Sequence, residues 1–121
     1  MQHVLLVDDE EAILYVFQKY LERAGFAVSA AASAHDAVAV FESTHVDALV
    51  TDQRMPGMKG DMLVQRLRSV RPDLPAFIVT AYAAECGPDL ENVPVLNKPV
   101  SPAELVAAVE RVLAAKSAPA A

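Results

Sequence analysis

Four apolar stretches of the chain end on side chains that could do chemistry. Asp8 and Asp9 follow VLLV, Asp52 follows ALVT, Thr80 closes AFIVT, and Lys98 comes just after VPVL. Carboxylates crowded together repel one another, and some take up protons unless cations neutralise them. A lysine and Mg²⁺ would do so, since Mg²⁺ binds one or two carboxylates together with water and phosphate oxygens. The set therefore indicates a phosphoryl group carried on an aspartate nucleophile.

Each of these residues has a plainer explanation when it is taken alone. An aspartate after a strand often caps the next helix or shapes a turn, which would account for Asp9 or Asp52. Thr80 alone would be a turn residue and Lys98 alone a solvated surface charge. The combination, in which a polar residue follows each of several apolar strands, favours a shared site.

The elements that must position these side chains alternate along the chain. Short apolar runs predict strands at 4–7, 27–31, 46–51, 76–80 and 93–96, and the run at 4–7 predicts a strand buried on both faces. Helical spacing of apolar residues predicts helices over 13–24, after Ser33, over 60–69 and after Ser101. This alternation predicts an α/β fold with a five-stranded parallel sheet and helices on both faces. Such sheets bind ligands at the carboxyl ends of their strands, where the polar residues lie.

Length and composition agree with one folded domain. The chain has 121 residues, of which 54% are hydrophobic, and its net charge is −6. An acidic balance argues against a nucleic-acid partner, which needs a basic surface. Because Cys86 is the one cysteine, an internal disulfide is excluded, and no apolar run approaches the length of about 20 residues that spans a membrane. We expect a soluble cytoplasmic protein with a domain at 3–115 and a flexible Ala-rich tail at 116–121.

The motifs LLVDDE, LVTDQRMPGMKG, FIVTAY and LNKPV, in this order, resemble the receiver domain of bacterial response regulators, including the chemotaxis regulators. The resemblance covers roughly 4–113. It implies a flavodoxin-like sheet with strand order 2-1-3-4-5. It also implies that Asp52 accepts a phosphoryl group from a histidine kinase or phosphotransfer protein and so switches the binding of an output protein. Such a module phosphorylates and dephosphorylates itself and is not a turnover enzyme.

The resemblance also assigns a metal site and its ligands. It implies that Asp9 and Asp52 bind Mg²⁺ or Mn²⁺ directly and that Asp8 binds through water. The backbone carbonyl of Arg54 would complete the protein's share of the ligands.

Three further roles follow from the same resemblance. Lys98 would contact the phosphoryl oxygens, and Thr80 would hydrogen-bond the attached phosphate. The Lys98–Pro99 peptide bond would be cis, an isomer found almost only before proline.

Two features depart from the pattern of the family. Residues 82–92 are few and contain Gly87-Pro88, so we expect the fourth helix to be shortened or lost, with at most one or two turns near 83–86. Val95 stands where many relatives carry an aromatic residue that turns inward on phosphorylation. Tyr82 and Arg54 hold positions that flank the phosphoryl group in relatives, and we expect them to slow its hydrolysis.

Other interpretations remain at this level. The chain is expected either to act alone, as a monomer or weak dimer, or to be a receiver cut from a hybrid histidine kinase. A pseudo-receiver scaffold would not need Asp52, Thr80 and Lys98 together. An aspartate-based phosphatase would show Asp-x-Asp where this chain has Asp52-Gln53-Arg54.

Overall fold

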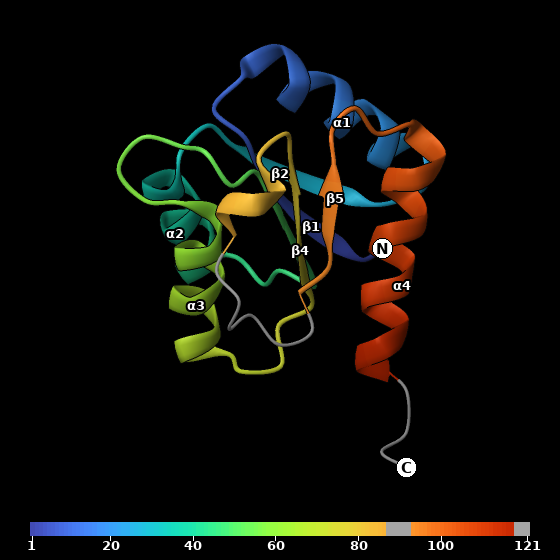
Figure 1. The fold of residues 1–121 in the computed structure, drawn as a ribbon. Coiled ribbons are helices and arrows are strands. Elements are labelled where there is room, and N and C mark those ends of the chain that lie inside the picture. Colours follow the sequence, from blue (N-terminus) through green and yellow to red (C-terminus); the bar gives the residue numbers. More distant parts are fainter. Residues whose placement is uncertain (87–92, 118–121) are drawn as a thin grey trace.

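The computed structural model describes residues 1–86 and 93–117, in which strands and helices alternate (Figure 1). The strands are β1 (His3–Val7), β2 (Ala27–Ala31), β3 (Ala48–Thr51), β4 (Ala76–Thr80) and β5 (Val95–Asn97). The helices are α1 (Glu11–Arg23), α2 (Ala34–Ser43), α3 (Gly60–Val70), α4 (Pro102–Ser117) and the 3-10 turn η1 (Ala83–Glu85).

The five strands form one parallel sheet in the order β2-β1-β3-β4-β5, which confirms the predicted topology. The register aligns their carboxyl ends: Val7 of β1 lies opposite both Ala31 of β2 and Thr51 of β3. Thr80 of β4 lies opposite Asn97 of β5. The residues that follow these strands therefore meet along one edge of the sheet.

Helices cover both faces of the sheet, as the alternation of β1 shows. Val4 and Leu6 pack into the core layer beneath α1 and α4, whereas Leu5 and Val7 pack into the layer beneath α2 and α3. Figure 1 shows these two pairs of helices on opposite sides of the sheet. Because both faces are apolar, the strand carries no polar alternation, and its position is held firmly from both sides.

The element boundaries follow local chemistry. Ser33 Oγ accepts the Asp36 N–H at 3.1 Å, which confirms the predicted cap of α2. Strand β5 begins at Val95 rather than 93, because Pro94 has no N–H to donate to a ladder. Helix α4 continues through Ser117, past the predicted domain boundary at 115, since Ala114 and Ala115 are strong helix formers.

Among the described residues that follow β4, the structure has a short helical turn, as the sequence predicts. Only the turn Ala83–Glu85 is helical among residues 82–86, in agreement with a shortened fourth helix. The rest of the predicted loop, 87–92, and the tail end, 118–121, lie outside the described residues. Within the described ranges, none of the helices combines the length and apolar character needed to cross a bilayer.

Candidate functional site

Asp8 begins the site at the end of β1. Its carboxyl group is only 2% exposed, because the strand that carries it is buried on both faces. Oδ1 accepts the N–H of Glu10 at 2.9 Å, which folds the following loop back over the end of the strand. Oδ2 accepts a hydrogen bond from Lys98 Nζ at 2.8 Å.

Asp52 stands at the end of the neighbouring strand β3 and is 6% exposed. Its N–H donates to the carbonyl of Val7 at 2.9 Å, which extends the sheet pairing into the site. Oδ1 accepts the N–H of Gln53 at 2.7 Å, and Oδ2 accepts from Lys98 Nζ at 3.3 Å. The carboxylate is thus oriented by one backbone donor and one cation.

Lys98, which follows the edge strand β5, hydrogen-bonds both carboxylates. Its N–H donates to the Thr80 carbonyl at 3.0 Å, which fixes its backbone beside the end of β4, and the Lys98–Pro99 bond is cis as expected. Burial alone would lower the pKa of Lys98, but the hydrogen bond and charge of Asp8, with the charge of Asp52, raise it above its usual value. The lysine therefore remains a cation between the two buried carboxylates.

The pKa of the Asp8 carboxyl group lies above its usual value, mainly because the group is buried. Burial raises this pKa, the hydrogen bond from Lys98 offsets only part of the rise, and the charge of Asp52 adds to it. A second cation at this place would lower the free energy of the ionised carboxylates.

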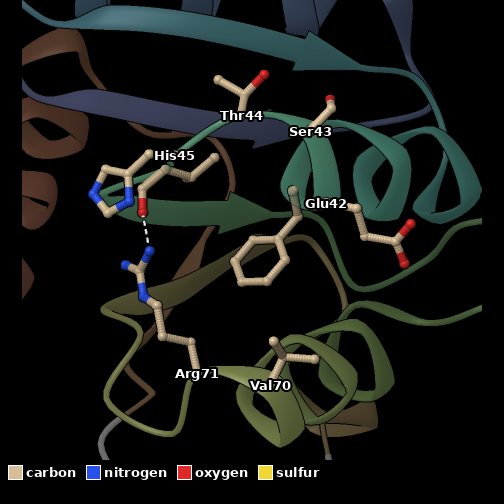
Figure 2. Close-up of a pocket in the computed structure, with 8 residues that line it drawn as sticks. Glu42, Ser43, Thr44, His45, Val70 and Arg71 are labelled. Atoms are coloured by element: carbon tan, nitrogen blue, oxygen red, sulfur yellow. Dashed lines mark hydrogen bonds between the residues drawn. The ribbon is translucent and has the colours of Figure 1, made fainter.

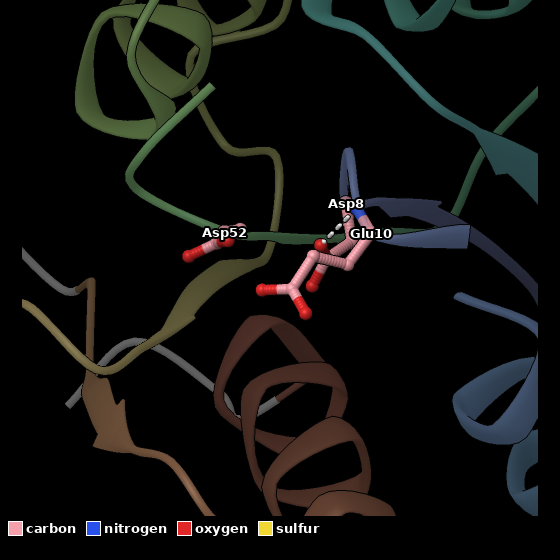
Figure 3. Close-up of side chains that lie close together, drawn as sticks. All are labelled: Asp8, Glu10 and Asp52. Carbon is pink, nitrogen blue, oxygen red and sulfur yellow. Dashed lines mark hydrogen bonds between the residues drawn. The ribbon is translucent and has the colours of Figure 1, made fainter. Parts of the chain in front are cut away.

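Three carboxylates lie close enough to share such a cation. One oxygen from each of Asp8, Glu10 and Asp52 lies within 4.8 Å of the others (Figure 3). Hard carboxylate oxygens and the excess negative charge fit a divalent ion that prefers oxygen ligands. This group could hold a metal ion.

The composition of this group differs in part from the sequence-based prediction. Asp9, predicted as a direct ligand, is exposed and is not a member of the group, whereas Asp8, predicted to act through water, is. Glu10 was missed, because its position at the start of α1 has the ordinary explanation of a charge that favours the helix dipole. The signal that could have revealed it is Asp8, whose side chain can bond the backbone two residues on and turn the loop inward.

The other predicted residues lie around this group. Thr80 is fully buried, and its Oγ1 accepts the N–H of Tyr82 at 3.0 Å. The Tyr82 ring is 44% exposed and carries the guanidinium of Arg54 on its face, with Cζ 3.7 Å from the ring centroid. Arg54 also forms an ion pair with Glu85, Nη2 to Oε1 at 2.6 Å. Val95, opposite Ile78 in the sheet, is 36% exposed.

A protein-family model matches most of the sequence of this chain. The model for the response regulator receiver domain matches residues 4–110. The chain belongs to the response regulator receiver family. Its place is therefore among the signalling modules of two-component systems.

Two curated relatives show how this receiver compares in sequence. The C4-dicarboxylate transport transcriptional regulatory protein DctD of Rhizobium meliloti (strain 1021) is 39% identical over 79 residues, covering 65% of this chain and 17% of DctD. The response regulator SaeR of Staphylococcus aureus (strain USA300) is 32% identical over 121 residues, covering 93% of this chain and 51% of SaeR. The chain thus spans about half the length of SaeR and less of DctD.

Solved structures show the same fold. A response regulator receiver protein from Sinorhizobium medicae WSM419 superposes with a TM-score of 0.83 at 30% identity, covering 95% of this chain and 96% of that one. The response regulator TrrA from Thermotoga maritima, solved in complex with Mg²⁺-BeF, superposes with a TM-score of 0.84 at 26% identity, covering 93% of this chain and 99% of TrrA.

The receiver has another hollow near the amino end of β3, away from Asp52 (Figure 2). Phe41, His45, Val46 and Arg71 are among its lining residues. Arg71 Nη1 donates to the Val46 carbonyl, but Nε and Nη2 have no hydrogen-bond partner in the described part of the chain. Both nitrogens are buried.

Proposed function

We propose that this receiver takes a phosphoryl group onto Asp52 from the phosphohistidine of a histidine kinase or phosphotransfer protein. The carboxylate changes charge and shape when it is phosphorylated, and this change alters the affinity of the domain for an output protein. The observation that carries the proposal is the Asp52 carboxylate, almost buried at the sheet edge and held by Gln53 N–H and Lys98 Nζ. The cytoplasm, where such donors meet receivers, is the compartment proposed with it.

The reaction is a transfer between two nucleophiles. An oxygen of Asp52 forms a bond to phosphorus while the bond from phosphorus to the donor imidazole breaks, and the imidazole nitrogen keeps the electron pair and takes up a proton. Lys98 stays charged and neutralises part of the negative charge on the phosphoryl oxygens. The protein thus contributes position and charge, as in other phosphoryl transfers. The Thr80 hydroxyl would then leave the Tyr82 N–H and bond the attached group.

A divalent ion, Mg²⁺ or Mn²⁺, is part of the proposal. Asp8, Glu10 and Asp52 would hold it, and it would supply positive charge to the phosphoryl oxygens during the transfer. The family resemblance adds Asp9 and the carbonyl oxygen of Arg54 as ligands. Support also comes from TrrA, whose structure contains Mg²⁺ with a beryllium fluoride, a group that stands in for a phosphoryl group.

Titration of the ion distinguishes the ligands. We expect Asp52→Asn and Glu10→Gln each to weaken Mg²⁺ binding measured by calorimetry. If Asp9→Asn binds Mg²⁺ as tightly as the unaltered protein, Asp9 is removed from the ligand set.

A receiver within a larger protein remains an alternative context for the same reaction. The receiver domain of the hybrid histidine kinase CckA superposes with a TM-score of 0.80 at 27% identity, covering 92% of this chain and 98% of that domain. The chemistry at Asp52 would be the same in either context, and the identity of the output partner would differ.

Incubation with acetyl phosphate and Mg²⁺ tests the proposal. We expect the unaltered protein and the exposed-site control Asp36→Asn to incorporate phosphate that is stable to acid and labile to hydroxylamine, and Asp52→Asn to incorporate none. Equal labelling of all three proteins, or no labelling with any phosphodonor, would overturn it.

A further inference from the structure

Gln53, the residue after Asp52, has a fully buried side chain that joins two segments on either side of the site. Its Oε1 accepts the N–H of Asp61 in the first turn of α3 at 2.8 Å. Its Nε2 donates to the carbonyl oxygen of Glu85 in η1 at 3.3 Å. Its own N–H donates to Asp52 Oδ1 at 2.7 Å. One residue therefore contacts the acceptor carboxylate, the start of α3 and the turn after β4.

The oxygen and the nitrogen of the Gln53 side-chain amide form hydrogen bonds with backbone groups of two other segments. The first amides of a helix have no partner within the helix. Lys59, the N-cap of α3, makes no capping hydrogen bond with its side chain among the described contacts, so Gln53 Oε1 serves the Asp61 N–H instead. The Gln53 side chain is 0% exposed, and removing its amide would break both of these hydrogen bonds.

Arg54 makes a second set of contacts with the same turn, through its side chain. It pairs with the Glu85 carboxylate and stacks on Tyr82, and the Arg54 side chain is 54% exposed. Exposed ion pairs contribute little to stability. The amide of Gln53 is therefore the buried one of the two links between the Asp52 loop and η1.

We propose that Gln53 is a positioning residue that holds the Asp52 carboxylate and the turn η1 in one arrangement. Without its amide, the peptide that donates to Asp52 Oδ1 and the turn at Glu85 would move independently. The effect on phosphoryl transfer rests on the function proposed above, whereas the effect on the turn does not.

Cys86 provides a probe of the turn within the natural sequence. It is the only cysteine of the chain, so a thiol reagent reports on this one place. Its side chain is partly buried against the core beneath α2 and α3, and its N–H donates to the Ala83 carbonyl at 3.1 Å. Opening of η1 would expose the thiol and raise its rate of labelling.

The test compares Gln53→Met, which keeps the length of the side chain and removes both polar ends, with Gln65→Met on the exposed side of α3. Without a phosphodonor, we expect Gln53→Met to label Cys86 about fivefold faster than the unaltered protein, the factor for one lost hydrogen bond of about 1 kcal/mol. We expect Gln65→Met to label at the unaltered rate. Val109→Ala opens a cavity in the core layer beneath α1 and α4 and is the control for general destabilisation. It should also leave the rate of Cys86 labelling unchanged.

Phosphorylation by acetyl phosphate gives the second readout. We expect Gln53→Met to lower the maximal rate of phosphate incorporation while the dependence on donor concentration stays the same, since the displaced group is the nucleophile. If circular dichroism shows that Gln53→Met is unfolded, Gln53→Asn replaces it, because that amide is too short to reach both segments. Unaltered Cys86 labelling in the folded variant overturns the proposal. If Gln53→Met labels Cys86 faster but even the unaltered protein incorporates no phosphate, the proposed function is overturned. The link between Gln53 and η1 would still stand.

Discussion

Replacement of Gly60 by alanine would disturb the acceptor loop directly. Gly60 is the first residue of α3, and its N–H donates to the Gln53 carbonyl at 2.9 Å. A Cβ on Gly60 would lie 2.1 Å from the carbonyl oxygen of Asp52 and 2.9 Å from its carbonyl carbon. Both atoms are backbone, so no side chain can rotate to relieve the clash.

The size of the effect follows from these distances. The two segments would have to separate by about 0.9 Å to restore a contact of 3.0 Å. Forcing extra atoms into a packed region costs about 1–3 kcal/mol, and alanine returns up to about 1 kcal/mol through helix propensity. We expect a net loss of about 1–2 kcal/mol in the free energy of unfolding. A displacement of about 1 Å at a reacting group can lower a rate by about 10²-fold, and we expect phosphorylation of Asp52 to fall by that order.

Urea denaturation and phosphate incorporation measure the two effects, with Gly25→Ala as the control. Gly25 has a φ of +97° and no atom within 4 Å of an added Cβ, so alanine there costs about 1–2 kcal/mol through strain alone. We expect the control to lose stability and to keep its phosphorylation rate. If Gly60→Ala were as stable and as reactive as the parent, the close approach of α3 to Asp52 would be wrong.

Three other variants test polar and aromatic side chains around the sheet. Lys98→Met removes the cation between two buried carboxylates and should lower the free energy of unfolding at pH 7 by about 3 kcal/mol. Urea melts should show a smaller loss near pH 4, since the raised pKa of Asp8 lets it take up a proton; an equal loss at both pH values would contradict this reasoning. For Asp47, burial alone would raise the pKa, but hydrogen bonds from the backbone N–H of His3 and from the His45 side chain lower it below the ordinary value of 3.8. Asp47→Asn should therefore cost about 1 kcal/mol at pH 7. This difference is present above pH 3.8 and should disappear as the pH falls through the lower folded-state pKa, whereas a difference independent of pH would refute it. Replacing Arg54 and Tyr82 together by alanine should speed the loss of phosphate several-fold in a chase assay, because the family resemblance places this stacked pair beside the phosphoryl group; unchanged decay would count against their shielding role.

The sheet was predictable because three of its strands, β1, β3 and β4, are buried on both faces. Runs such as Val4–Val7 have no polar alternation, and only a parallel sheet covered on two sides buries them fully. The polar residues after these runs then had to meet at one edge, and the structure brings Asp8, Asp52 and Lys98 into hydrogen-bond contact there. Boundaries were less predictable: the start of β5 depends on which strand residues pair, and Pro94 moves it to Val95.

The parts of the site that were missed depend on the path of loops. The position of Glu10 in the acidic group results from the turn at Asp8, and residue spacing gives no sign of which way that loop folds. The contact of Gln53 with the Glu85 carbonyl joins residues 32 positions apart through a segment whose helix is shortened in this chain. A polar residue after the acceptor does not by itself indicate burial, so its role became visible only with the three-dimensional arrangement.

The central claim is that Asp52 is the phosphoacceptor, and mapping of the phosphorylated residue tests it most directly. The protein is treated with acetyl phosphate and Mg²⁺, digested under acidic conditions, and analysed by tandem mass spectrometry. We predict one phosphate, located on Asp52 within the segment that joins β3 to α3. A phosphate found on Asp8, Asp9 or Glu10 instead, or spread over several residues, would contradict the account.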